Sequence, residues 1–206
     1  MTRTLSDDDI ATFRTRLCAV AERLFGRLGV ENVGIRQIAQ ELGCSPMTPY
    51  RYFRDKDEIL AATRAAAFDR FAAALEAATA TTEGDPVAQS SAAGEAYIRF
   101  ALGEPNAYRL MFDLAQPGEE EHPELARAVT RARRTMTIHV QALVAAGLLD
   151  GDPVLLGHVF WAAIHGVVSL QLASKLDAGP DFETIRREVL RLLIRGAMPE
   201  GAVGGS

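Results

Sequence analysis

The sequence predicts an all-α protein of about nine helices. Apolar residues recur at spacings of three and four along most of the chain, which is the periodicity of amphipathic helices. Aromatic residues make up only 7% of the 206 residues, whereas alanine and leucine are abundant. No segment shows the strict alternation of a half-buried strand. Proline and glycine divide the chain into stretches of helical length.

The first two predicted helices have well-marked ends. Residues 10–28 carry a single apolar stripe, and Ser6 before them is an N-cap candidate. Residues 35–42 form the second helix. Gly43 closes it, because glycine readily adopts the left-handed backbone angles common just after a helix. Residues 1–9 are expected to be a disordered arm.

The third predicted helix spans residues 45–53. Ser45 is its N-cap, and Pro46 lies at the first helical position, where proline is tolerated. Pro49 would then be the fourth helical residue and would remove only the first intrahelical hydrogen bond. It would also bias Thr48 away from helical backbone angles. We therefore expect an α-helix whose first turn is reshaped.

The remaining chain is predicted to be helical except at its loops. A capping-box pattern at residues 55–58 opens a long helix that ends near residue 77. A Thr- and Gly-rich stretch at 77–85 predicts a surface loop, and Gly-rich residues 198–206 predict a disordered tail. Five more helices are expected. They span residues 86–102, 106–114, 123–146, 153–176 and 181–196.

The second and third helices have the layout of a helix-turn-helix, in which Gly43 makes the turn. A helix that enters the major groove needs a slender exposed face, flanked by hydroxyl and cationic side chains that hold the phosphates. Thr48, Tyr50 and Arg51 supply such groups. Lys56 lies at the start of the next helix, where backbone N–H groups also favour a phosphate. Residues 10–64 hold nine Lys/Arg and six Asp/Glu, within a chain whose net charge is -5.

Residues 10–64 resemble the DNA-binding domain of the TetR family of bacterial regulators. The matching residues are Ile38, Ala39, Gly43, Ser45, Tyr50, Phe53, Lys56, Ile59 and Leu60. The resemblance implies phosphate contacts from Tyr50, Tyr52 and Lys56. It implies contacts at base edges or the groove rim from Arg36, Met47, Thr48 and Arg51, and Ser45 completes the predicted DNA-binding set. Pro49 stands where the family usually has leucine, so base contacts cannot be copied from relatives.

Residues 65–197 are predicted to bind an effector and to form a dimer. The helix at 153–176 is apolar nearly all round and must therefore be covered on every side. Together with the stripe of the last helix it predicts a four-helix interface in a homodimer. The alternative is a monomer that buries both helices internally. The predicted interface residues are Ala162, Ala163, Gly166, Leu170, Ile185, Val189 and Leu192.

The order Trp161, His165, Gly166 resembles the signature of a TetR subfamily with a WHG-type C-terminal domain, and residues 108–112 resemble its short middle helix. Aromatic and thioether side chains with few polar groups suit a small apolar or amphipathic effector. The alternative is that these side chains form an ordinary core. The predicted effector-binding residues are Tyr97, Phe100, Tyr108, Met111, Phe112, Met136, His139, Trp161 and His165.

The sequence thus predicts a ligand-released repressor that binds a palindromic operator in double-stranded DNA as a dimer. The four histidines show no metal-ligand spacing and no serine lies in a nucleophile elbow, so neither a cofactor nor an enzyme is expected.

The N-terminus lacks a signal core, and polar residues interrupt the apolar run 154–173. We therefore expect a cytoplasmic protein without a membrane span. The alternative is a helical small-molecule-binding protein with impaired DNA binding.

Overall fold

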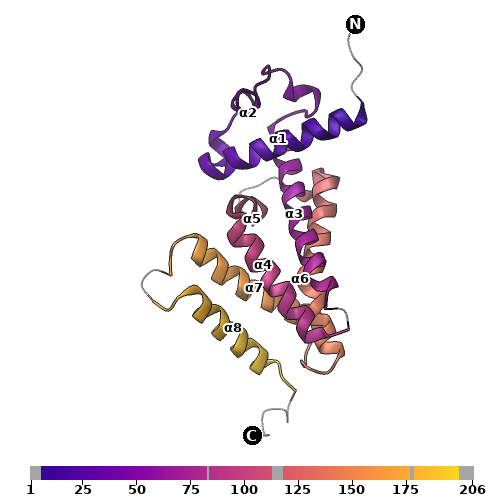
Figure 1. The fold of residues 1–206 in the computed structure, drawn as a ribbon, viewed down its shortest axis with the longest axis vertical. Helices are drawn as coiled ribbons and strands as arrows, with labels where there is room; N and C mark the ends of the chain where they lie inside the picture. Colours follow the sequence, from indigo (N-terminus) through magenta and orange to yellow (C-terminus); the bar gives the residue numbers. More distant parts are fainter. Residues whose placement is uncertain (1–5, 83, 113–117, 177–178, 200–206) are drawn as a thin grey trace. The chain divides into compact units, whose positions relative to one another are not determined.

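A computed structural model describes residues 6–82, 84–112, 118–176 and 179–199 (Figure 1). Within these ranges the protein is all-α, which confirms the predicted fold class, and no strand is present. Eight of the nine expected helices are α-helices. They are α1 (Asp7–Leu28), α2 (Ile35–Glu41), α3 (Lys56–Ala80), α4 (Pro86–Gly103), α5 (Pro105–Phe112), α6 (Pro123–Ala145), α7 (Pro153–Leu172) and α8 (Phe182–Gly196).

The ninth expected helix, at residues 45–53, is not an α-helix. Only a short 3-10 turn, Pro49–Arg51, forms there. Pro49 has no N–H to donate to the Ser45 carbonyl, and Thr48 N donates to it instead at 2.8 Å. The following bonds from Arg51 and Tyr52 also span three residues rather than four. Thr48 nevertheless has helical angles, φ -65° and ψ -45°, so the bias predicted for it was wrong.

The predicted caps are present at α1 and α3. Ser6 accepts a hydrogen bond from Asp9 N at 3.1 Å, and the Asp9 carboxylate accepts one from Ser6 N at 3.2 Å. At α3, Asp55 accepts from Glu58 N at 2.8 Å. Glu58 reaches one residue further back than expected and accepts from Arg54 N at 2.7 Å.

Several helix ends differ from those predicted. The proposed arm at 1–9 is shorter, because α1 begins at Asp7 with three acids in its first turn that suit the helix dipole. Helix α3 runs through Ala80, because alanine favours the helix over the predicted loop. Helix α7 ends at Leu172 rather than at residue 176. Positions 1–5 of the arm, 113–114 of a predicted helix and 200–206 of the tail lie outside the described residues.

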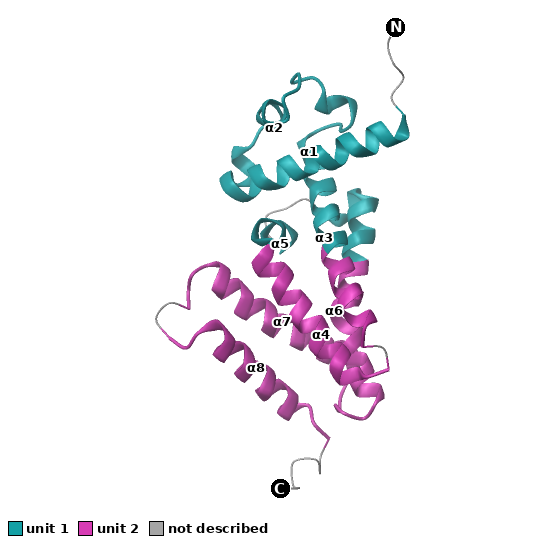
Figure 2. Cartoon of the chain, in the orientation of Figure 1, with its two compact units in different colours: residues 1–70, 104–130 teal, residues 71–103, 131–206 magenta. Residues whose placement is uncertain are grey.

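The chain divides into two compact units, which Figure 2 colours separately. Unit 1 comprises residues 1–70 and 104–130, and unit 2 comprises residues 71–103 and 131–206. The boundary falls inside α3 and α6, so each of these helices contributes to both units. The predicted boundary near residue 64 separates a DNA-binding domain from an effector-binding and dimerisation domain. This functional division stays a prediction.

Unit 1 is built on the apolar stripe of α1. Leu17, Ala21 and Leu24 are buried against Ile38 of α2 and Leu110 of α5. Helix α5 approaches α1 closely at Gly26, where an added Cβ atom would lie 2.4 Å from the Asn106 side chain. Glycine is therefore required at that crossing.

Unit 2 contains α4, α7 and α8 with parts of α3 and α6. The Phe71 ring packs edge-on against the rings of Tyr97 and Phe100, with centroids 5.3 Å apart in both pairs. Helix α7 meets α6 at Gly157, where an added Cβ would lie 2.9 Å from Thr137. The loop after α6 is joined to the end of α8 by a 2.7 Å hydrogen bond from Asp150 N to the Ala197 carbonyl.

Candidate nucleic-acid interface and ligand cavity

The side chains predicted to contact DNA lie at the surface of unit 1. Met47 is 68% exposed and Tyr50 is 49% exposed. The other exposed members of the predicted set are Arg36, Ser45 and Arg51. Thr48, Tyr52 and Lys56 are half-buried. A duplex can therefore approach residues 45–51 even though they form a turn rather than an α-helix.

Two buried residues hold this segment on the protein. Pro49, which the sequence singled out as unusual, is fully buried, and Phe53 is 3% exposed within the core of unit 1. The Tyr52 ring stacks on Phe13 of α1, with ring centroids 4.2 Å apart. Burial of Pro49 turns Tyr50 and Arg51 outward, so the proline contributes packing as well as disrupting the helix.

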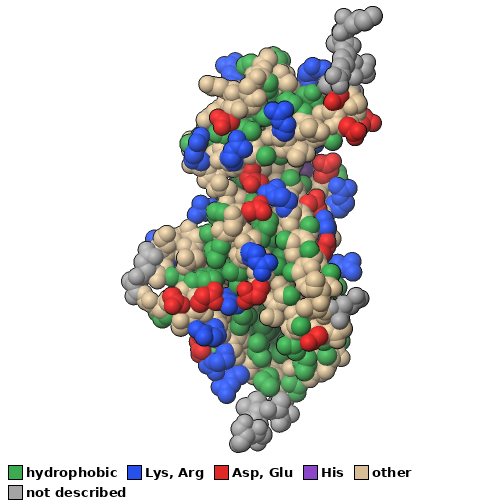
Figure 3. Space-filling model, in the orientation of Figure 1, with side chains coloured by type: hydrophobic (Ala, Val, Ile, Leu, Met, Phe, Trp, Pro, Cys, Tyr) green, Lys and Arg blue, Asp and Glu red, His purple; other side chains and the backbone are tan. Residues whose placement is uncertain are grey.

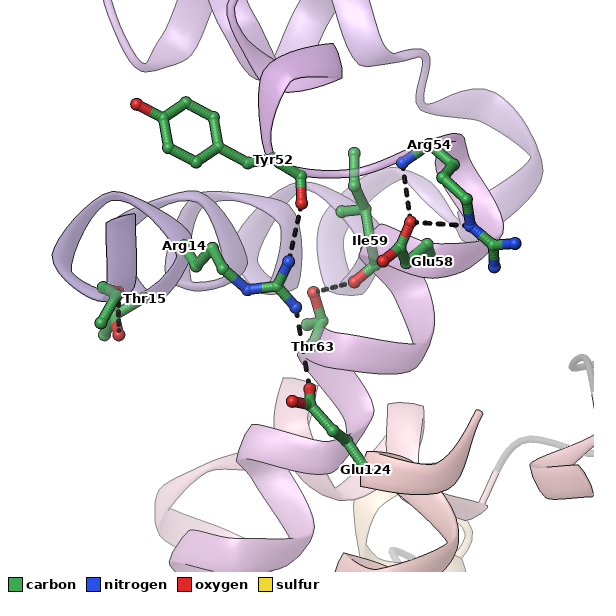
Figure 4. Close-up of polar contacts among 9 residues, drawn as sticks. Arg14, Thr15, Tyr52, Arg54, Glu58, Ile59, Thr63 and Glu124 are labelled. Atoms are coloured by element: carbon green, nitrogen blue, oxygen red, sulfur yellow. Dashed lines mark hydrogen bonds and ion pairs between the residues drawn. The ribbon is translucent and has the colours of Figure 1, made fainter. Parts of the chain in front are cut away.

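Arg14 on α1 joins three parts of unit 1, as Figure 4 shows. Its Nη1 donates a 2.7 Å hydrogen bond to the Tyr52 carbonyl. Its guanidinium carbon also lies 4.2 Å from the centre of the Phe53 ring. Its Nη2 lies 3.7 Å from the Glu124 carboxylate at the start of α6. Sequence reasoning missed this residue. The available signal was a cation at a stripe position of helix 10–28, three residues before Leu17.

The start of α3 is capped by its own acids. The Asp55 carboxylate accepts a hydrogen bond from Glu58 N. The Glu58 carboxylate accepts from both Arg54 N and Arg54 Nε (Figure 4). Asp57 adds a further negative charge in the first turn. These carboxylates oppose a phosphate at the helix terminus, so the Lys56 ammonium is the better candidate for a phosphate contact than the backbone N–H groups.

Unit 2 contains a cavity of about 420 Å³. Its walls come from the end of α3 and from α4, α6, α7 and α8, and most of its lining is apolar. Four predicted effector residues line it, namely Tyr97, Met136, His139 and Trp161. The volume lies within the range of about 300–1,000 Å³ typical of small-molecule sites.

The other five predicted effector residues do not line this cavity. Phe100 points its ring at Phe71. Tyr108, Met111 and Phe112 belong to unit 1, where the Tyr108 and Phe112 rings pack together with centroids 4.9 Å apart. His165 bonds within the protein: its Nδ1 is 3.5 Å from the Tyr97 hydroxyl and its Nε2 is 3.4 Å from Ser169 Oγ.

Burial disfavours the charged form of both histidines of this region. Desolvation lowers the pKa of His139 below its ordinary value, and the Thr135 backbone opposes this in part. Desolvation likewise lowers the pKa of His165. A neutral imidazole both donates and accepts a hydrogen bond, so His139 in the cavity wall can meet either kind of group on a ligand.

The charged groups in the cavity wall are already paired. Arg186 of α8 donates from Nη1 to Glu95 of α4 at 3.0 Å. Its Nε and Nη2 both donate to Glu183, at 2.9 and 2.7 Å. These carboxylates raise the pKa of Arg186, and the Glu183 hydrogen bond is the largest cause.

Helices α7 and α8 leave much apolar surface uncovered. Only four of the twenty α7 residues are buried, and no residue of α8, which is described throughout, is buried. Figure 3 shows hydrophobic side chains gathered over unit 2. Among the predicted interface residues, Leu170 and Leu192 are 46% and 56% exposed. Ala162 and Gly166 are also exposed, and Ala163, Ile185 and Val189 are half-buried.

Two family models match the chain. Residues 17–63 match "Bacterial regulatory proteins, tetR family", and residues 90–193 match "Tetracyclin repressor-like, C-terminal domain". An HTH-type transcriptional regulator of Staphylococcus aureus (strain USA300) is 44% identical over 46 residues, which are 22% of this chain and 25% of that protein. The match thus spans about a quarter of that curated relative's length.

Solved structures extend the likeness over most of the chain. A protein of unknown function from Rhodococcus sp. RHA1 is 30% identical, with a TM-score of 0.76 over 90% of this chain and 95% of that one. The TetR regulator PfmR of Thermus thermophilus is 22% identical (TM-score 0.67, 87% and 97% covered). FadR of Bacillus subtilis, solved with stearoyl-CoA, is 16% identical (TM-score 0.73, 88% and 98% covered). The latter two share the fold. With two matched family domains that cover most of its length, the chain belongs to the TetR family of DNA-binding transcriptional regulators.

Proposed function

We propose that this regulator is a repressor that binds a palindromic operator as a homodimer and is released when a small apolar or amphipathic effector enters unit 2. It would act in the cytoplasm, where its DNA lies. The cavity of about 420 Å³ is the observation that carries the proposal. A regulator that acts without an effector would have no need of an apolar cavity of ligand size, since empty apolar space costs stability.

The dimer is supported by the uncovered apolar surface of α7 and α8. Val154, Leu155 and Leu192 are each more than half exposed, at 53%, 62% and 56%. Apolar patches of this kind in proteins that are not membrane-bound usually mark an interface. In a dimer with its twofold axis at these helices, residues 45–51 of the two protomers could bind half-sites about 34 Å apart on one face of the duplex.

Release follows from a coupling between the two binding events. In one conformation of the dimer, residues 45–51 of the two protomers would no longer match the spacing of the operator half-sites. An effector that prefers this conformation lowers operator affinity, and the operator must lower effector affinity by the same factor. Such couplings are typically about 1–3 kcal/mol, so release would be substantial without being absolute. The stearoyl-CoA held by FadR is amphipathic, which agrees with an amphipathic effector as a class.

Selection of genomic DNA fragments by the full-length protein tests the proposal. We expect a near-palindromic site bound by one dimer, with molar mass measured by light scattering. Tyr50→Phe should weaken binding to every sequence if the hydroxyl holds a phosphate, whereas Thr81→Val, which removes an exposed hydroxyl of unit 2 outside the cavity lining, is the matched control. Recovery of no sequence, together with effector binding, would favour the helical small-molecule binder with impaired DNA binding. Simultaneous binding of operator and effector with unchanged affinities would refute release.

A further inference from the structure

Charged side chains are scarce in the lining of the unit 2 cavity. Its only charged lining residues, among those that the structure describes, are Glu95 and Arg186, which pair with each other at 3.0 Å. The remaining nitrogens of the Arg186 fork are held by Glu183. An anionic group entering the cavity would therefore have to displace two carboxylates before it met a cation.

A cationic ligand would find no unpaired carboxylate among the described residues of the wall. Glu95 already accepts from Arg186, and Glu183 does so through two hydrogen bonds. The rest of the wall includes Met136, Phe160 and Ile164, which offer no counter-charge. An unpaired charge buried against such a wall costs several kcal/mol, so ionised ligands of either sign are disfavoured.

One polar atom of the wall lacks a good partner. The buried Nδ1 of His139 makes no well-formed hydrogen bond to the described part of the protein, although the Thr135 backbone one turn earlier interacts with the ring. A buried polar atom without a good partner costs free energy, and a ligand toward which the ring turns would recover it. His139 lies between apolar neighbours on α6, so it can fix the orientation of a ligand that is otherwise held by burial.

We propose that the effector is an uncharged, mainly apolar molecule that carries one hydroxyl, amide or similar group, which hydrogen-bonds to His139. This inference rests on the proposed effector site and narrows its ligand class. Fatty acids and acyl-CoA esters are excluded from this class. Their carboxylate or phosphate groups would have to compete with Glu95 and Glu183 for Arg186.

The only tryptophan of the chain, Trp161, lies in the cavity wall and provides the assay. Decan-1-ol, decanoate and decanoyl-CoA have the same ten-carbon chain and differ in their head groups. At pH 8 the decanoate carboxyl is fully ionised. We expect decan-1-ol to shift Trp161 emission saturably and to raise the Tm, and each anionic ligand to bind at least about tenfold more weakly, because it must break the Arg186 pairs.

Two variants locate the ligand and the selectivity. Gly94→Leu places a side chain into the cavity from α4, where a Cβ at Gly94 meets no atom within 4 Å, and it should abolish the decan-1-ol response. The double variant Glu95→Gln/Glu183→Gln keeps the shape of the site but releases Arg186. It should raise decanoate affinity by about tenfold and leave decan-1-ol binding unchanged.

Three results would overturn the inference. They are decanoate or decanoyl-CoA binding as tightly as decan-1-ol to the unmodified protein, no saturable response to decan-1-ol, and an unchanged decan-1-ol response in Gly94→Leu. The assay contains no DNA, so a failure of operator release leaves it intact. Conversely, tight decanoate binding would refute the ligand class and leave DNA binding and ligand release standing.

Discussion

Replacing Arg14 by methionine is expected to destabilise the protein by about 2–4 kcal/mol and to loosen residues 45–54. The 2.7 Å hydrogen bond to the Tyr52 carbonyl has a charged donor, and such bonds contribute about 1.5–3 kcal/mol. The cation–π contact with Phe53, at 4.2 Å, adds about 0.5–1 kcal/mol. Methionine retains the packing of the aliphatic stem, so the loss comes from the guanidinium.

The third partner of Arg14 contributes much less. Glu124 is 67% exposed and lies 3.7 Å from the guanidinium, and exposed ion pairs are worth about 0–1 kcal/mol. Arg14→Met should therefore be costly, while Glu124→Gln, which removes only the ion pair, should stay within about 0.5 kcal/mol of the unmodified protein. Arg14→Lys keeps the charge but loses the planar fork, so its effect should be intermediate.

Urea unfolding followed by far-ultraviolet circular dichroism measures these differences at one fixed protomer concentration, because dimer stability depends on concentration. The loss for Arg14→Met corresponds to a Tm lower by about 4–16 °C for a chain of this length. Hydrogen exchange of the peptide covering residues 45–54 reports the loosening locally. If Arg14→Met and Glu124→Gln had equal effects, or if exchange in that peptide did not change, the assignment of the Tyr52 carbonyl bond as the main contribution would be refuted.

Three other perturbations test the DNA contact, the dimer and the cavity histidine. Lys56→Ala should weaken binding to all DNA sequences alike and reduce the salt dependence by about one unit, and a sequence-selective loss in anisotropy titrations would show that Lys56 reads bases instead. Leu192→Glu should shift the dimer to monomer in light scattering, whereas Leu102→Glu on α4 should not; a dimer unaffected by Leu192→Glu would place the interface elsewhere. The depressed pKa of buried His139 means that the unfolded chain binds a proton more readily than the folded one. Stability from this group is therefore complete above about pH 6.5 and is lost as the pH falls below that value, and His139→Gln should flatten the Tm profile there.

The sequence predicted best where the constraint is local. The stripe of α1, its Ser6–Asp9 capping box and the Asp55 cap depend on residues within one or two turns, and all three are present. Residues 45–53 also obey local rules, but two prolines and the burial of Pro49 in the core of unit 1 together favour a 3-10 turn. Propensity alone could not reveal that burial.

The cavity residues show the limit of periodicity. A helical repeat tells which side chains share a face, and it brought Trp161 and His139 to the cavity. It does not tell which helices pack together, so Tyr108 on α5 could not be excluded, although it lies in unit 1. The Tyr52 partner of Arg14 and the Glu95 partner of Arg186 were missed for the same reason, since they are 38 and 91 residues away in the sequence. The pair of Arg186 with Glu183, three residues away, follows from local spacing and is present.

Helix α7 is long and apolar enough, by length and composition, to cross a membrane. Its neighbour argues for a protein partner instead, because α7 packs against α8 in unit 2. Helix α8 has only 15 residues, too few to span a bilayer, and six of them are charged. Placing α8 beside α7 in lipid would cost about 2.5–3.5 kcal/mol for each charged residue held near the bilayer centre. The proposed second copy of the chain would cover the apolar faces of both helices and leave Arg187 and Arg191 in water, so a dimer would satisfy α7 and α8 together, whereas a bilayer would satisfy only α7.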